Sequence, residues 1–247
     1  MAKSTIILDE KILKPYRDIE NHLRFVSRFS LPTNLEKIIS TFCETNYANK
    51  TQIAKGAIFY RSRIHDFQQQ KPFDIDSMGA PPRGVASSGR INPHGIPYLY
   101  CSYEKQTAIS EVRPWKGATL SVGKFQINRD IEIIDLSDRN VVSLSFKLDQ
   151  DLNETDKAFG QALVSQLLTA HYFSQPTHNS DEHAYLASQY ISEKIKLMGV
   201  DAIAYPSVLN SEGKNICFFS LEDATCSSVE EVNIDNVSYS FNDKTNS

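Results

Sequence analysis

The chain has 247 residues, 40% of them hydrophobic and 23% charged, with a formal net charge of −4 and a pI of about 5.9. This composition is typical of a folded globular protein and excludes a mostly disordered chain. The net negative charge lacks the excess of lysine and arginine that is typical of nucleic-acid-binding proteins. No apolar run approaches the length of a membrane-spanning helix. We therefore expect neither direct nucleic-acid binding nor a membrane protein.

The N-terminus and the cysteines favour a cytoplasmic protein. The apolar run Ile6-Ile7-Leu8 is too short for the core of a signal peptide. The cysteines are scattered and form no C-x-x-C pair, so we expect reduced thiols. They are Cys43, Cys101, Cys217 and Cys226. The histidines between positions 171 and 183 match no standard ligand spacing, and no metal is expected.

Residues 1–50 are predicted to be a helical extension that precedes the main domain. Leu35, Ile38, Ile39 and Phe42 follow the i, i+3, i+4, i+7 pattern of an amphipathic helix. The first strand of the main domain is expected over 56–60. A long polar loop, rich in proline and glycine, follows over 66–89.

A strand is predicted over 96–101, followed by a short helix that Ser102 caps and Pro114 terminates. Two strands should come next, over 119–127 and 131–136. The apolar residues of the first strand change phase near Gly123, which predicts a β-bulge.

Two further helices are predicted over 155–168 and 184–198, and two strands over 200–205 and 216–219. The last 22 residues are polar, and either add an edge strand near 232–239 or stay loose. Because strands and helices are mixed without strict alternation, the sequence predicts an α+β fold. The expected division is an extension over 1–50, a main domain over 51–225, and a tail or edge strand over 226–247.

The segment from Gly89 to Glu111 brings a cation, aromatic rings and a carboxylate close together in the sequence. Arg90 is able to donate two parallel hydrogen bonds to a phosphate or carboxylate. Tyr98 and Tyr100 share one face of the predicted strand and offer rings for stacking. Glu111, near the end of the short helix, is able to stabilise a developing positive charge.

Each of these residues also has an ordinary structural interpretation. Arg90 and Glu111 are of types that usually face solvent, and Tyr98 has about even odds of packing in the core. Ser207 follows a strand and a proline, where a serine often forms a turn, and no G-x-S-x-G surrounds it. The absence of a P-loop and of G-x-G-x-x-G argues against kinase, GTPase and Rossmann functions.

The chain resembles the RES domain family over about residues 54–220. The resemblance is carried by Tyr60-Arg61-Ser62-Arg63, Gly89-Arg90-Ile91-Asn92-Pro93-His94-Gly95-Ile96-Pro97-Tyr98-Leu99-Tyr100, Thr107-Ala108-Ile109-Ser110-Glu111-Val112, Tyr205-Pro206-Ser207 and Ile216-Cys217-Phe218-Phe219. RES proteins include toxins of toxin–antitoxin pairs, and their fold is similar to that of the ADP-ribosyltransferases. The resemblance implies a mixed or antiparallel sheet with flanking helices.

The resemblance also implies consumption of NAD⁺ by cleavage of the bond between nicotinamide and ribose. Carried over by position, the catalytic residues are Arg90, Tyr100, Glu111 and Ser207. The residues expected to help bind the substrate are Arg61, Arg63, Asn92, Gly95 and Tyr98.

Three functions stay open at this point. The first is an NAD⁺ glycohydrolase or phosphorylase that acts as a toxin, with water or phosphate as acceptor. The second is an ADP-ribosyltransferase that modifies a protein, and the third is an inactive interaction module with the same fold. No cofactor is expected beyond NAD⁺ as substrate. An antitoxin would be a separate chain, and a homodimer is possible.

Overall fold

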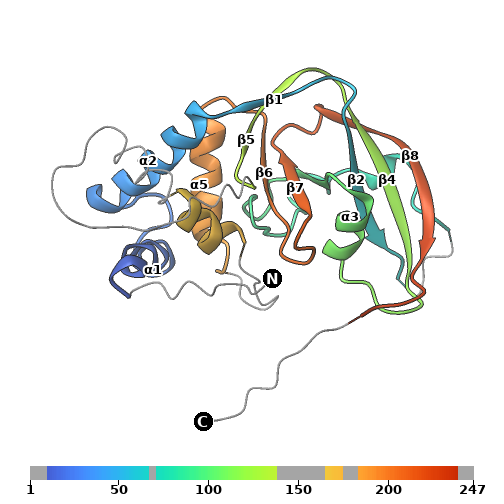
Figure 1. Cartoon of the computed structure of the whole chain (residues 1–247), viewed down its shortest axis with the longest axis horizontal. Helices are drawn as coiled ribbons and strands as arrows, with labels where there is room; N and C mark the ends of the chain where they lie inside the picture. The colour runs from blue at the N-terminus through green and yellow to red at the C-terminus, as the bar shows by residue number, and fades with distance from the viewer. Residues whose placement is uncertain (1–9, 67–70, 138–164, 175–182, 239–247) are drawn as a thin grey trace, which may run out of the picture.

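The computed structural model describes residues 10–66, 71–137, 165–174 and 183–238. Figure 1 shows a group of helices beside one end of a long, strongly twisted sheet, and a shorter helix that lies against the sheet further along. The helices are α1 (Glu10–Phe25), α2 (Thr33–Ala48), α3 (Lys105–Glu111) and α5 (Leu186–Leu197), with a 3₁₀ turn, η1 (Asp76–Met78), and a π-helical turn, η2 (Thr169–Phe173).

The strands are β1 (Thr51–Ile53), β2 (Ile58–Ile64), β3 (Leu99–Ser102), β4 (Thr119–Ile127), β5 (Ile131–Asp135), β6 (Ala202–Pro206), β7 (Lys214–Phe218) and β8 (Ala224–Asn233). They form one eight-stranded sheet in the order β1-β5-β6-β7-β3-β2-β4-β8. All neighbours are antiparallel except β5 and β6, which are parallel. The predicted α+β class, with a mixed sheet and flanking helices, is confirmed.

The sheet separates two apolar clusters, because successive side chains of a strand point to opposite faces. In β6, Ile203 and Tyr205 belong to the cluster that contacts α1, α2 and α5, whereas Ala202 and Ala204 belong to the other. The second cluster also holds Phe59, from β2. Both faces of the central strands are therefore covered, which explains why those strands are so apolar.

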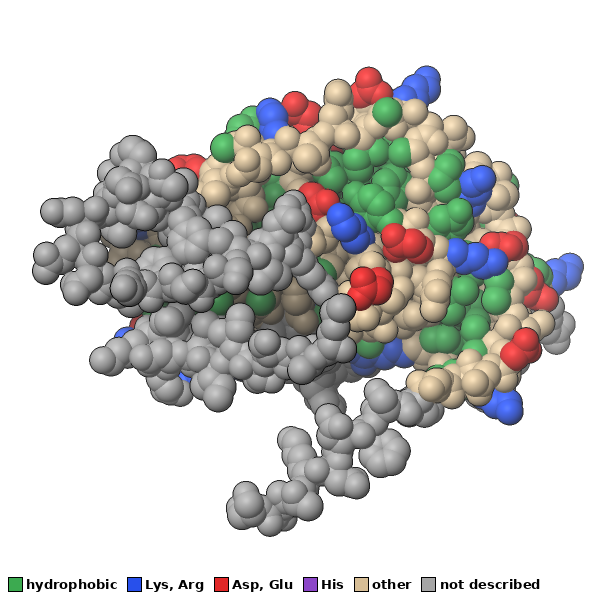
Figure 2. All heavy atoms as spheres, in the orientation of Figure 1, with side chains coloured by type: hydrophobic (Ala, Val, Ile, Leu, Met, Phe, Trp, Pro, Cys, Tyr) green, Lys and Arg blue, Asp and Glu red, His purple; other side chains and the backbone are tan. Residues whose placement is uncertain are grey.

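The N-terminal helices share a core with the sheet. Ile19 of α1 and Ile39 of α2 are fully buried in the same cluster as Ile191 of α5 and Ile203 of β6. No helix in the described ranges is long and apolar enough to cross a membrane. In the view of Figure 2, lysine, arginine, aspartate and glutamate side chains are interspersed over the sheet half of the molecule.

Most predicted strands and helices are present, and the bulge predicted in β4 is confirmed by a register shift between Lys124 and Phe125 in its pairing with β8. The predicted cap is wrong: Ser102 belongs to β3, and Glu104 precedes the first residue of α3. The predicted helix over 155–168 lies mostly outside the described residues.

Two strands extend further than the pattern predicts. β2 continues to Ile64, although polar side chains at Arg61 and Arg63 suggested that it had ended. The edge strand begins at Ala224 rather than near 232, because β8 exposes one face and its polar side chains hide the alternation.

The connection after β3 determines where the candidate site forms. β2 and β3 pair at one position only, Tyr60 with Ser102, whereas β3 pairs with β7 along its whole length. Helix α3 begins three residues after β3 and packs mainly on β2. Gly213 lets α3 approach the β6–β7 connection, since a Cβ there would lie 2.3 Å from the Thr107 hydroxyl oxygen.

Candidate active site

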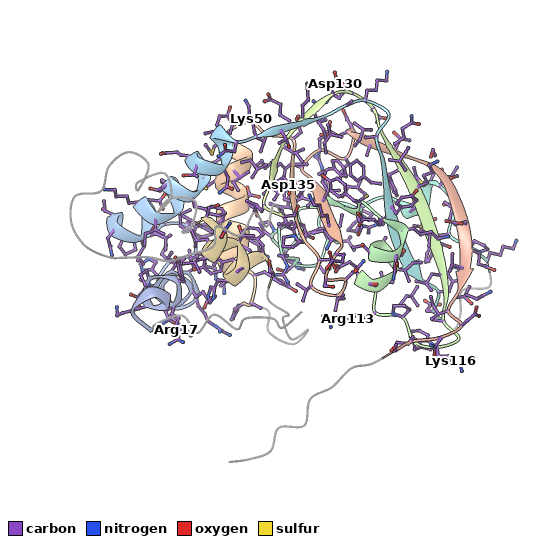
Figure 3. All side chains as sticks on the ribbon, in the orientation of Figure 1. Arg17, Lys50, Arg113, Lys116, Asp130 and Asp135 are labelled. Carbon is purple, nitrogen blue, oxygen red and sulfur yellow. The ribbon has the colours of Figure 1, made fainter. Side chains whose placement is uncertain are left out.

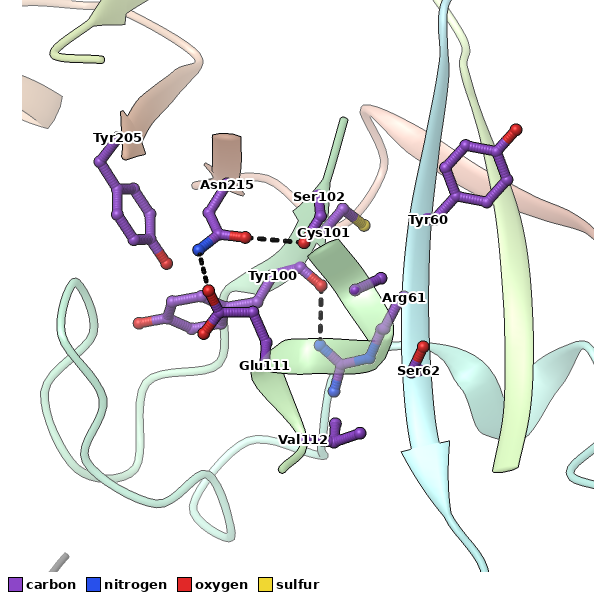
Figure 4. Close-up of a pocket in the computed structure, with 11 residues that line it drawn as sticks. Tyr60, Arg61, Ser62, Tyr100, Cys101, Ser102, Glu111, Val112, Tyr205 and Asn215 are labelled. Atoms are coloured by element: carbon purple, nitrogen blue, oxygen red, sulfur yellow. Dashed lines mark hydrogen bonds between the residues drawn. The ribbon is translucent and has the colours of Figure 1, made fainter. Parts of the chain in front are cut away.

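A cavity of about 180 Å³ lies where β2, β3, β6 and β7 face α3 (Figure 4). The residues that line it are Tyr60, Arg61, Ser62, Tyr100, Cys101, Ser102, Ala108, Glu111, Val112, Tyr205 and Asn215. The cavity therefore brings together three residues predicted from the sequence, namely Arg61, Tyr100 and Glu111. It combines a guanidinium and a carboxylate with several hydroxyl groups.

Glu111 lies at the end of α3, and the chain turns sharply after it. The next residues are the helix cap Val112 and then Arg113, which has a left-handed φ of 51° and donates its N–H to the carbonyl of Ser110 at 2.9 Å. This conformation often ends a helix, and Pro114 then prevents its continuation. Figure 3 places Arg113 below the end of α3.

One oxygen of the Glu111 carboxylate is held by two donors. Its Oε1 accepts a hydrogen bond from the Ser207 hydroxyl at 2.6 Å and another from Asn215 Nδ2 at 2.6 Å. Hydrogen bonds to a carboxylate are charge-assisted and stronger than neutral ones. Within the described ranges, Oε2 makes no such bond, although Glu111 as a whole is exposed.

Ser207 is both a turn residue and a partner of the carboxylate. Its Oγ accepts the N–H groups of Leu209 at 3.2 Å and Asn210 at 3.0 Å, which is the turn-forming role considered from the sequence. Its single hydroxyl proton is therefore directed to Glu111. One side chain therefore both forms the turn and holds the Glu111 carboxylate.

Asn215 was missed by reasoning from the sequence. It is only 4% exposed, and its Oδ1 accepts a hydrogen bond from the Ser102 hydroxyl at 2.7 Å. The available signal was one polar amide beside the apolar run Ile216–Phe219, because a buried polar side chain needs a partner within the fold.

Arg61 brings a positive charge into the cavity, and no carboxylate of the described residues forms an ion pair with it. Its Nη1 donates to the carbonyl of Tyr100 at 3.0 Å, and its buried Nε has no hydrogen-bond partner. No ion pair with Arg61 is formed by the residues that the structure describes. Burial lowers the pKa of this guanidinium, but arginine stays charged at neutral pH. The cavity therefore offers an unmatched positive charge to an anion.

Tyr100 fastens the loop that precedes it. Its hydroxyl accepts the N–H groups of Ile91 at 3.0 Å and Asn92 at 3.1 Å, and donates to Asn92 Oδ1 at 2.7 Å. Gly89 is needed at this place, because a Cβ there would lie 2.7 Å from the Tyr100 hydroxyl oxygen. Burial raises the pKa of Tyr100 well above its ordinary value, so the hydroxyl keeps its proton.

Arg90 lies beside the cavity and does not line it. Its Nη1 donates to the carbonyl of Tyr172 at 2.9 Å, and its guanidinium lies 5.2 Å from the ring centre of Tyr185. The lining residue Tyr205 lies near the charges of both Arg90 and Glu111. Figure 4 shows the Tyr205 hydroxyl on the side of the Glu111 carboxylate. Burial is the main reason that the pKa of Tyr205 is raised.

Four other residues predicted to bind substrate lie outside the cavity. Asn92 is buried, and its Nδ2 donates to the carbonyls of three loop residues. Gly95 has a φ of +83° and completes the same loop. Tyr98 is 2% exposed in the core and bonds to Glu193 and Lys196. Arg63 binds the carbonyl of Ser77 and stacks over Phe73 at 4.1 Å, which attaches the 71–80 segment to β2.

The arrangement is suited to a ligand that carries both an anion and a centre that becomes positive. The guanidinium of Arg61 would attract the anion, and the carboxylate of Glu111 would stabilise the positive centre. Among the described residues, no three histidine, cysteine, aspartate or glutamate side chains form a metal-binding group.

The chain was compared with family models, curated proteins and solved structures, and the family model agrees with the motifs. The family model of the RES domain matches residues 58–242. A crystal structure of the M. tuberculosis MbcT–MbcA toxin–antitoxin complex contains a similar chain, with a TM-score of 0.43 and 11% identity, over 79% of this chain and 94% of that one. No curated protein matches the sequence significantly. The family model covers most of the chain, including the four strands that line the cavity and the helix that carries Glu111, and this protein therefore belongs to the RES domain family.

Proposed function

We propose that this protein is an NAD⁺-consuming toxin that cleaves the bond between nicotinamide and ribose, with water or phosphate as acceptor. The observation that carries the proposal is one cavity in which an unmatched guanidinium, Arg61, faces the same space as a carboxylate held by two donors, Glu111. NAD⁺ has the matching chemistry, since it joins a pyrophosphate to a cationic nicotinamide riboside.

The size of the cavity limits how much of NAD⁺ it would enclose. Pockets that enclose a drug-sized ligand usually measure roughly 300–1,000 Å³, and this cavity measures about 180 Å³. We infer that it takes the nicotinamide riboside end, with Arg61 reaching the neighbouring phosphate. The remainder of the dinucleotide would lie along the opening, toward Tyr205 and Arg90.

The chemistry requires stabilisation of positive charge. When the bond between ribose C1 and the nicotinamide nitrogen breaks, both electrons go to the nitrogen, nicotinamide leaves neutral, and the ribose becomes an oxocarbenium-like cation. The Glu111 carboxylate, through Oε2, would bind a ribose hydroxyl and stabilise that cation. Water then adds at C1 and releases a proton to give ADP-ribose, or phosphate adds to give the 1″-phosphate.

The test is incubation of the purified chain with NAD⁺, with and without inorganic phosphate, with products identified by mass spectrometry. We expect nicotinamide release by the wild type and a loss of at least about 100-fold in Glu111→Ala, comparable to the loss of an oxyanion-hole donor. Glu132→Ala is the matched control, because Glu132 lies on β5, is about half exposed, and forms an ion pair with Lys50 alone within the described part of the chain.

The products distinguish the acceptors. ADP-ribose identifies water, and its 1″-phosphate identifies phosphate. Label from NAD⁺ attached to a protein in added lysate would instead establish the transferase. Intact NAD⁺ under all three conditions would refute the proposal and favour an interaction module. A separately encoded antitoxin, which the family resemblance implies, is the partner we propose.

A further inference from the structure

We propose that Asn215 is a positioning residue that aims the Glu111 carboxylate, so that one oxygen is anchored to the sheet and the other faces the substrate. This inference rests on the proposed function for its kinetic consequence. Its structural part concerns only four side chains joined by hydrogen bonds. Figure 4 shows the bonds from Ser102 to Asn215 and from Asn215 to Glu111, and the Ser207 hydroxyl donates to the same Glu111 oxygen.

The direction of the Asn215 amide follows from its neighbours. A carboxylate only accepts hydrogen bonds, so the group facing Glu111 must be the amide nitrogen, Nδ2. The amide oxygen then faces Ser102, whose hydroxyl donates to it at 2.7 Å. Because Ser102 is 2% exposed and Asn215 is 4% exposed, water does not replace these bonds easily. Ser102 therefore donates to Asn215, and Asn215 in turn donates to Glu111.

The two donors to Glu111 come from different parts of the fold, a strand inside the sheet and a turn. Asn215 lies within β7, which pairs with β3 on one side and β6 on the other. Ser207 lies just after β6, where the chain turns outward. Ser207 alone would attach the carboxylate to a turn, whereas Asn215 attaches it to the interior of the sheet. With both bonds on Oε1, the direction of Oε2 is fixed.

This fixed direction matters more for the transition state than for substrate binding. A carboxylate already oriented toward the developing cation does not need to reorganise as the bond breaks. In the ground state, the ribose carries no comparable charge at C1, and Arg61 supplies an independent contact for the phosphates. Loss of Asn215 should therefore lower kcat and leave the KM for NAD⁺ nearly unchanged.

The test compares Asn215→Ala and Asn215→Asp with the wild-type chain in nicotinamide release. A hydrogen bond to a charged group is worth about a 10- to 100-fold change in rate, which is the loss expected in kcat for Asn215→Ala, with KM changed less than about threefold. Asn128→Asp is the matched control, because Asn128 is exposed beyond β4, and its amide bonds to Glu222 and Thr225.

Asn215→Asp keeps the shape of the side chain and adds a readout that a packing role would not produce. Near neutral pH the introduced carboxylate would repel Glu111 at hydrogen-bond distance, and activity should fall. As the pH decreases, one proton is shared between the two carboxyl groups and the hydrogen bond returns. The ratio of variant to wild-type activity should therefore rise toward acidic pH, whereas the ratio for Asn215→Ala should stay level.

Equal kcat in Asn215→Ala and the wild type would overturn the inference, as would ratios for Asn215→Asp that do not depend on pH. If the wild type itself leaves NAD⁺ intact, the proposed function fails separately. The positioning is then decided by crystal structures of the wild type and Asn215→Ala. A Glu111 carboxylate that turns away from Ser207 supports the inference, and an unchanged carboxylate overturns it.

Discussion

Two arginines show how differently the same side chain is used in this molecule. Arg129, in the turn between β4 and β5, binds the carboxylates of Asp201 and Asp223 at 2.6 and 2.7 Å. Arg61 binds one backbone carbonyl and leaves its buried Nε without a partner. A buried charge that lacks an opposite charge costs folding free energy. Such a cost is often found where the protein binds a ligand of the opposite charge.

This contrast predicts that Arg61→Met separates stability from binding. The melting temperature should stay the same or rise, because an unmatched buried charge is removed. The affinity for NAD⁺ should fall at least about tenfold, because a charged contact to phosphate is lost. Thermal unfolding and calorimetric titration of NAD⁺ measure the two effects. A marked loss of stability with unchanged affinity would assign Arg61 to the fold alone.

At the scale of elements, the end of the sheet opposite the cavity is held together by charge. The turn after β4 carries Arg129, which joins the start of β6 through Asp201 and the start of β8 through Asp223. Asp223 is 3% exposed and its Oδ2 has no hydrogen-bond partner. Burial raises the pKa of Asp223, and Arg129 opposes that rise.

Arg129→Met should therefore destabilise the protein in a way that depends on pH. At about pH 7.5 we expect a loss of about 1–3 kcal/mol in the free energy of unfolding. This is less than for a fully buried pair, because Arg129 is half exposed. A carboxyl group whose pKa is raised by folding binds protons more tightly in the folded state. Its contribution to stability consequently increases as the pH falls through its folded pKa toward its unfolded value.

The difference between Arg129→Met and the wild type should accordingly shrink as the pH falls and Asp223 takes up a proton, because the charge that Arg129 neutralises is then lost. Urea unfolding at several pH values measures this difference. A gap that stays constant or widens in acid would show that Asp223 is not the group responsible. Nicotinamide release should be unaffected by the substitution, since Arg129 does not line the cavity.

At the scale of the whole molecule, the N-terminal helices are part of the main core and not a loose extension. Tyr16, Ile19 and Leu23 of α1 form one cluster with residues of α2, α5 and the sheet. The Tyr172 hydroxyl also donates to the carbonyl of Tyr16 at 2.8 Å. The carbonyl of Tyr172 in turn accepts a hydrogen bond from Arg90, so Tyr172 connects α1 to the loop before β3.

We expect Ile19→Ala to destabilise the entire molecule by about 2–5 kcal/mol, because Ile19 is fully buried and its truncation leaves a cavity. Leu197→Ala is the control, since Leu197 is 85% exposed and should change stability by less than about 0.5 kcal/mol. Urea unfolding followed by circular dichroism measures both. Equal stabilities for the two variants would mean that α1 does not contribute to the cooperative core.

The sequence by itself determined the α+β class, most strands, the helix that carries Glu111 and the family. These follow from local periodicity, turn residues and ordered motifs, which are properties of neighbouring positions. Only the tertiary structure decided that Arg61 enters the cavity, that Arg90 and Tyr98 do not line it, and that Asn215 holds Glu111. Asn215 is 104 residues from Glu111, and such a contact depends on strand order and on the close approach of α3, neither of which is encoded in local spacing.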